Sequence, residues 1–176
     1  MSSTLDVGTV LPTIVSRAVQ LSDSAGGVIY EYDQATRIFD PRATHNVDDK
    51  LKAAQQSEPI SLGEGAVGRA VATRSPVQIG DLRFTSSHGA RVRVRDLLLE
   101  RDYASVLAVP LLVEDEILGA LVILRREVGE LGPETVELMK TFATQSALAI
   151  RNARLFREIE IKSRELEVCS SAFGLQ

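Results

Sequence analysis

The chain has 176 residues and a formal net charge of -4, so its length fits one domain with some additional helix and its charge does not favour a nucleic-acid-binding surface. Its single cysteine, Cys169, excludes an intrachain disulfide and a cysteine-based zinc or iron–sulfur site. No apolar run approaches the ~18 residues of a membrane span, and the N-terminus lacks a signal-peptide pattern, so we expect a cytoplasmic protein that does not insert into a membrane.

The first part of the chain predicts a helix, a hairpin and a second helix. Apolar residues recur at helical spacing over 5–21, where Pro12 fits a first-turn position. Two segments, 28–32 and 38–43, flank turn residues at 33–36, and this arrangement is typical of a β-hairpin. Asn46 is an N-cap candidate for the next predicted helix, 46–56.

A glycine-rich stretch over 61–74 contains Gly63, Gly65 and Gly68 in the spacing G-x-G-x-x-G. In a dinucleotide-binding loop this spacing follows a buried parallel strand. Here the preceding residues, SEPISL, are too few and too polar for such a strand, and Glu64 would place its charge beside a pyrophosphate. We therefore interpret Gly63 and Gly65 as a tight turn, and Gly68 as the point where a short helix lets another backbone come close.

The second part predicts a short strand at 77–79, a short helix at 92–103 and a hairpin formed by 105–113 and 117–124. Because both hairpin strands are almost continuously apolar, we expect them to be buried on both faces. Pro110 cannot donate to the ladder, so it predicts a bulge or an unpaired position.

From Pro133 onward the chain predicts one long helix with two apolar stripes. The first stripe suits packing on a sheet and contains Val136, Met139, Phe142, Ala143, Ser146, Ile150 and Ala153. The second contains Leu148, Leu155, Ile159 and Leu166, at the spacings of a coiled-coil seam. The alternative is a solvated helix end that frays; we favour the seam because an isolated helix with an apolar stripe needs a partner. The last residues, CSSAFGLQ, lack the helical pattern and predict a flexible tail.

Three segments, ISLGEGAVGRAVATRSPVQIGDL, SVLAVPLLVEDEILGALVILR and VELMKTFATQSALAIRNARLFREI, together resemble GAF domains, most of all those of bacterial sensor histidine kinases. The resemblance implies an α+β fold with a central antiparallel sheet. The N- and C-terminal helices would pack on one face, and short helices and loops would roof a pocket on the other. We expect the GAF-like domain to occupy 1–161, and 162–176 to continue the signalling helix into the tail.

The resemblance also suggests several chemistries known among GAF domains, and each can be compared with the residues of this chain. The N-K-x(n)-F-x3-D-E signature of cyclic-nucleotide-binding members is absent. Bilin-binding and methionine-sulfoxide-reducing members use cysteines in the domain body, whereas Cys169 lies in the tail, so we expect neither covalent bilin nor that enzyme activity. Haem would need a ligand such as His88, and we disfavour it because a lone loop histidine is usually solvated. The cofactor is unknown, and no catalytic or metal-ligating set emerges.

The residues that the resemblance places around the pocket are Tyr32, Phe39, Ile79, Asp81, Phe84, Arg91, Tyr103, Ser105 and Leu107. Most are also typical core residues. Asp81 is expected to anchor its loop by accepting backbone N–H groups. Arg91, Arg93 and Arg95 are either a solvated face paired with nearby acids, which we favour, or an anion-binding rim.

These inferences predict a ligand-sensing, dimerising input module of a bacterial two-component system. It would form a homodimer through its first and last helices and pass a signal along the last one. The alternative is a purely structural dimerisation module without a small-molecule ligand. A third hypothesis, a small enzyme, lacks a reactive group in the predicted pocket.

Overall fold

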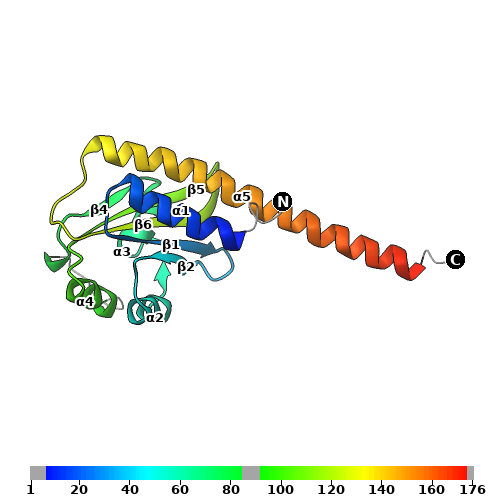
Figure 1. Ribbon diagram of the computed structural model, residues 1–176, viewed down its shortest axis with the longest axis horizontal. Coiled ribbons are helices and arrows are strands. Elements are labelled where there is room, and N and C mark those ends of the chain that lie inside the picture. Colours follow the sequence, from blue (N-terminus) through cyan, green and yellow to red (C-terminus); the bar gives the residue numbers. More distant parts are fainter. Residues whose placement is uncertain (1–6, 85–91, 174–176) are drawn as a thin grey trace.

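The computed structural model describes residues 7–84 and 92–173, which form a six-stranded sheet with helices on both faces (Figure 1). The strand order is β3-β2-β1-β6-β5-β4, and every neighbouring pair is antiparallel. The strands are β1 (Gly26–Asp33), β2 (Ile38–His45), β3 (Ile60–Ser61), β4 (Val77–Ile79), β5 (Ser105–Val113) and β6 (Glu116–Arg125). This confirms the α+β fold with a central antiparallel sheet.

The helices divide between the two faces of the sheet. On one, here called the helix face, lie α1 (Val7–Leu21) and the long α5 (Pro133–Phe173). On the other, the roof face, lie α2 (Asp49–Ser57), α3 (Gly65–Thr73), α4 (Val92–Glu100) and the 3-10 turn η2 (Leu82–Phe84). Each face has its own buried apolar cluster, so β5 and β6 are covered on both sides as their apolar runs predict.

The glycine stretch forms a corner, as predicted. Gly63 and Gly65 have φ values of 85° and 63°, which favour glycine. A Cβ on Gly68 would lie 2.4 Å from the Ser61 carbonyl oxygen, so the missing side chain lets the two backbones meet. Gly63 N–H donates to the Gly68 carbonyl at 3.0 Å and closes the corner.

Two helix starts differ from the sequence prediction. α1 begins at Val7, so Pro12 lies inside the helix and not at its first turn. α2 is capped by Asp48 and not by Asn46: the Asp48 carboxylate accepts from Leu51 N–H at 2.9 Å. Asn46 instead has a φ of 56°, and its amide donates to the Ala25 carbonyl. Asn46 thus forms part of the turn between β2 and α2, and Asp48 caps the helix.

Two further features lie at other positions along the chain than the sequence predicted. The register shift in the β5–β6 hairpin lies between Leu111 and Leu112, and Pro110 itself pairs with Ala120. α5 continues to Phe173, so the predicted end of the helix near Val168 was wrong. No glycine or proline stands between Val168 and Phe173, and the helix is therefore not interrupted. Among the described residues, no helix combines the length and apolar character needed to cross a membrane.

Candidate functional site

The roof face is packed by side chains from the sheet and from α2, α3 and α4. Phe39 and Leu51 are fully buried, and Tyr30 is 3% exposed. The ring of Tyr32 lies 4.8 Å from that of Phe39, centroid to centroid. Since these groups fill the space above β1 and β2, a ligand on this face would have to use the borders of the cluster or displace part of it.

The predicted pocket residues divide into several groups. Tyr32, Phe39, Ile79 and Tyr103 belong to the roof-face cluster or pack against it. Phe84 is 80% exposed and therefore does not line the cluster. Arg91 and His88 lie outside the described residues. The Tyr103 hydroxyl donates to the Asn46 carbonyl at 2.8 Å, and burial raises the pKa of this phenol.

Ser105 and Leu107 require a correction, because both lie away from the roof face. Leu107 is fully buried in the helix-face cluster, whereas its neighbours Val106 and Ala108 face the roof. The Ser105 hydroxyl donates to the Glu127 carbonyl at 2.6 Å and so holds the linker between β6 and α5. From Val106 to Val113 the strand is apolar throughout, so its sequence does not reveal which alternate set of side chains faces which side of the sheet.

Asp81 anchors the loop after β4, which is the structural role that the sequence suggested. Its carboxylate accepts from Arg83 N–H at 3.0 Å and from the Arg83 guanidinium at 3.0 and 2.7 Å. These hydrogen bonds, with the side-chain contact to Arg83 first, hold the pKa of Asp81 below its ordinary value.

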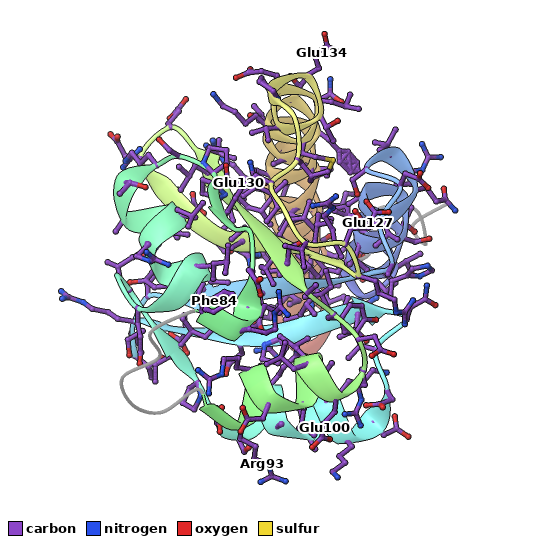
Figure 2. All side chains as sticks on the ribbon, turned by 90° about the vertical axis from the view of Figure 1, so that its left-hand side faces the viewer. Phe84, Arg93, Glu100, Glu127, Glu130 and Glu134 are labelled. Atoms are coloured by element: carbon purple, nitrogen blue, oxygen red, sulfur yellow. The ribbon has the colours of Figure 1, made fainter. Side chains whose placement is uncertain are left out.

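Of the two described arginines of α4, Arg93 lies at the surface and Arg95 is partly buried. Arg93 is exposed and, with Glu100, lies on the outer surface of the helix (Figure 2). Arg95 is half-buried and lies 3.4 Å from the Asp96 carboxylate. Pairing with a neighbouring acid fits the solvated-face interpretation better than a shared anion site.

Gln55 is a buried polar residue of the roof. It is 3% exposed on α2, and its side-chain carbonyl oxygen has no hydrogen-bond partner among the described residues. Leaving such a group unpaired costs about 1–3 kcal/mol. A donor supplied by a ligand or a water molecule would remove that cost, so Gln55 is a candidate contact residue.

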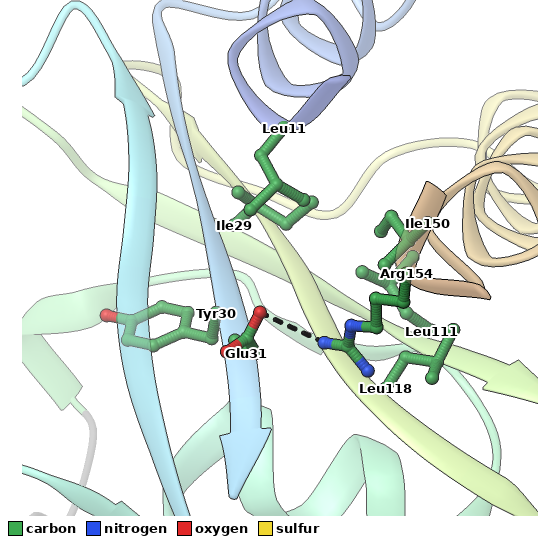
Figure 3. Close-up of a pocket in the computed structure, with 8 residues that line it drawn as sticks. All are labelled: Leu11, Ile29, Tyr30, Glu31, Leu111, Leu118, Ile150 and Arg154. Carbon is green, nitrogen blue, oxygen red and sulfur yellow. Dashed lines mark ion pairs between the residues drawn. The ribbon is translucent and has the colours of Figure 1, made fainter. Parts of the chain in front are cut away.

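A second polar cluster ties the sheet to α5 on the helix face. Glu31, on β1, contacts Arg154 of α5 at 3.0 Å (Figure 3). It also contacts Arg42 of β2 at 3.4 Å. Arg42 is the additional residue in a β-bulge, since Ile29 and Tyr30 pair with the residues on either side of it. Glu31 thereby holds α5 at the point where the helix leaves the sheet.

The hollow beside this cluster is too small for an organic ligand. It is lined by apolar side chains, including Leu11, Ile29 and Ile150, together with Glu31 and Arg154. Its cavity volume is about 10 Å³, which is room for about one water molecule. The close-up in Figure 3 shows the Glu31–Arg154 ion pair at this hollow.

The seam residues predicted on the last helix are all exposed. Leu148 and Leu155 are each 46% exposed, Ile159 is 66% and Leu166 is 70%. The sheet-facing stripe of the same helix is buried at Met139, Ala143, Ser146, Ile150 and Ala153. From Arg154 to Phe173 the helix projects beyond the sheet for about 30 Å (Figure 1). An exposed apolar stripe therefore extends from the body of the domain into this projecting half.

The arrangement of an antiparallel sheet between paired terminal helices and a helical roof agrees with a comparison against protein families. A model described as a GAF domain matches residues 4–151. The chain belongs to the GAF domain family. Comparison with curated proteins finds no match to the sequence.

Solved structures similar to this GAF domain come from proteins with different names. The GAF domain/HD domain protein from Geobacter sulfurreducens has a TM-score of 0.71 at 19% identity, covering 88% of this chain and 97% of that one. A domain designated a two-component sensor histidine kinase protein, from Sinorhizobium meliloti, has a TM-score of 0.66 at 12% identity, covering 82% and 90%. Free methionine-R-sulfoxide reductase from Neisseria meningitidis has a TM-score of 0.68 at 16% identity, covering 86% and 81%. Such different names on one fold mean that function must be argued from the residues of this chain.

Sequence reasoning missed two residues of this GAF domain, Gln55 and Glu31. A glutamine in a short amphipathic helix looks like a surface residue, and only the packing of α2 shows its burial. Glu31 stands between Tyr30 and Tyr32 in β1, and these tyrosines face the roof. Because side chains alternate along a strand, Glu31 must face the helix side, where a charged partner could have been expected. Its partner Arg154 lies more than a hundred residues away, which no local pattern indicates.

Proposed function

We propose that this GAF domain is an input and dimerisation module of a signal-transduction protein, and that it passes its state to a following segment through α5. The observation that carries the proposal is the exposed apolar stripe formed by Leu148, Leu155, Ile159 and Leu166. An apolar stripe on a helix that extends beyond its own domain is stabilised when a second helix covers it.

Dimerisation through this stripe is tested by placing charge inside and outside it. Ile159→Lys puts an ammonium in the stripe, whereas Glu167→Lys puts one on an exposed position beside it. In size-exclusion chromatography with light scattering, we expect Ile159→Lys to shift the protein toward monomer and Glu167→Lys to leave the dimer. Equal masses for the two variants would contradict the seam.

Ligand sensing is the second part of the proposal, and Gln55 supports it. A buried amide oxygen without a partner is a group that a ligand donor would satisfy. A ligand that binds one arrangement of the roof more tightly would shift the population toward that arrangement. The bond of Glu31 to Arg154 gives β1, whose tyrosines face the roof, a direct contact with α5.

The alternative is a structural dimerisation module whose roof is filled by its own side chains, and the packing around Phe39 and Leu51 favours it. Two measurements separate the alternatives: native mass spectrometry of protein purified from its host, and a thermal-shift screen with nucleotides, amino acids and small acids. A bound molecule, or a rise in melting temperature that Gln55→Leu abolishes, would support sensing. Protein without a bound molecule and without any shift would favour the structural module.

We further propose that the parent protein is a sensor histidine kinase and that any kinase reaction belongs to another part of it. The support is the resemblance to histidine-kinase GAF domains together with a signalling helix that continues past the sheet. We assign no reaction to this chain. The cytoplasmic location stays a prediction.

A further inference from the structure

We infer that hydrogen bonds from β4 to the linker between β6 and α5 couple the packing of the roof to the first turn of α5. The inference rests on the proposed function and deepens it, because it names the contacts that would regulate the helix. Three hydrogen bonds are involved, here called the linker clasp. Two of them join Gln78 to Leu131, and the third joins Gly80 to Gly129.

The strand β4 has a different neighbour on each side of the sheet. Val77 and Ile79 pack against the roof-face cluster. Gln78 lies between them and pairs with Leu107 of β5, which belongs to the helix-face cluster. Since paired residues of neighbouring strands face the same side, Gln78 points toward the helix face. A displacement of β4 by the roof is therefore felt on the helix face as well.

Gln78 binds the linker with both groups of its side-chain amide. Its NH₂ group donates to the Leu131 carbonyl at 3.2 Å, and Leu131 N–H donates to its carbonyl oxygen at 2.7 Å. A glutamine amide offers the same donor and acceptor as a backbone peptide, so this pair resembles the bonding of an added strand. The linker passes this edge of the sheet on its way to α5 (Figure 1).

The first turn of α5 follows the clasp directly. Val136 N–H donates to the Gly132 carbonyl at 3.1 Å and so begins the helix. Gly132 is the neighbour of Leu131, and Leu131 also packs against the helix-face cluster. Releasing Leu131 from Gln78 would therefore loosen the acceptor on which this turn depends. The clasp thus controls how firmly the first turn of α5 is formed.

The clasp is joined to the roof through the residues that follow β4. Gly129 N–H donates to the Gly80 carbonyl at 2.7 Å. Two residues further on, Leu82 is 4% exposed in the roof-face cluster, and its N–H donates to the Ala104 carbonyl at 2.8 Å. So short a segment transmits a displacement of Leu82 to Gly80 and to the linker. A continuous series of bonds then connects the roof with Val136.

Amide hydrogen exchange of the full chain tests this coupling, because spatial proximity alone does not demonstrate it. Leu82→Ala removes a buried side chain from the roof, and we expect amides 136–139 to exchange several-fold faster. Gln78→Met should have a similar effect, since it removes the clasp. In the double variant, Leu82→Ala should add nothing to Gln78→Met.

Leu51→Ala is the matched control. Leu51 is buried in the same roof-face cluster but lies on α2. It should leave amides 136–139 unchanged, because the ends of helices exchange by local opening. If Leu82→Ala does not fold, Asp81→Ala replaces it, since it removes the carboxylate that holds Arg83 in the same turn.

Two results would overturn the coupling. One is an unchanged exchange rate at amides 136–139 in the roof variant, and the other is the same acceleration with and without Gln78. Sedimentation of the same samples keeps the proposed function separate. A monomer that shows the coupling would contradict the proposed dimer alone, whereas a dimer without the coupling would contradict the linker clasp alone.

Discussion

Gly68→Ala tests whether the glycine stretch is a packing corner. The added Cβ would lie 2.4 Å from the Ser61 oxygen, 2.8 Å from Gly63 N and 3.0 Å from Gly63 C, all of them backbone atoms that no rotamer change can move. Overpacking of this kind costs about 1–3 kcal/mol. The Gly63–Gly68 hydrogen bond adds about 1 kcal/mol if it breaks, and the better helix propensity of alanine returns about 1 kcal/mol.

We therefore expect Gly68→Ala to lower the free energy of unfolding by about 2 kcal/mol. Urea denaturation followed by circular dichroism, at one protein concentration, measures this change. Gly80→Ala is the control, because its Cβ would meet only ordinary contacts, the nearest at 3.4 Å from a Glu130 side-chain carbon. If Gly68→Ala were as stable as Gly80→Ala, the corner interpretation would be refuted.

Three further changes have defined outcomes. Gln55→Met should raise the free energy of unfolding of ligand-free protein by about 1 kcal/mol, measured by urea denaturation, since it removes an unpaired buried oxygen; a loss of stability would indicate that the oxygen has a partner in solution. Glu31→Gln should cost about 1 kcal/mol or less, yet speed hydrogen exchange of α5 beyond the sheet; the surface-pair variant Lys140→Gln should not speed it. Leu51 N–H and then Arg101 hold the pKa of Asp48 below its ordinary value, so Asp48 stabilises the fold above the unfolded-state pKa. The melting temperature of Asp48→Asn should accordingly be lower than wild type at neutral pH and equal to it well below pH ~3.9; a difference that persists in acid would rule out the charge as its cause.

Patterns with one clear period predicted their elements well. The two stripes of α5 differ in the sequence and differ in burial, because a helix that packs on a sheet must separate its faces. The glycine corner was predictable since a positive φ and a close backbone approach both restrict a position to glycine.

The failures have equally specific causes. β5 is apolar at every position after Ser105, so the side that Leu107 faces depends on pairing with β6 and not on its own sequence. Asn46 and Asp48 are both good caps, and the choice depends on how the chain leaves β2. Gln55 and the Glu31–Arg154 pair depend on tertiary packing, which makes them the part of the site that only the structure reveals.

The proposed function depends most on whether the exposed stripe of α5 joins two copies of this chain. Sedimentation equilibrium of the unmodified protein over a range of concentrations tests it directly. If the stripe joins two copies, the molar mass approaches twice 19.1 kDa as concentration rises. A mass of 19.1 kDa at every concentration, up to the solubility limit, would contradict it.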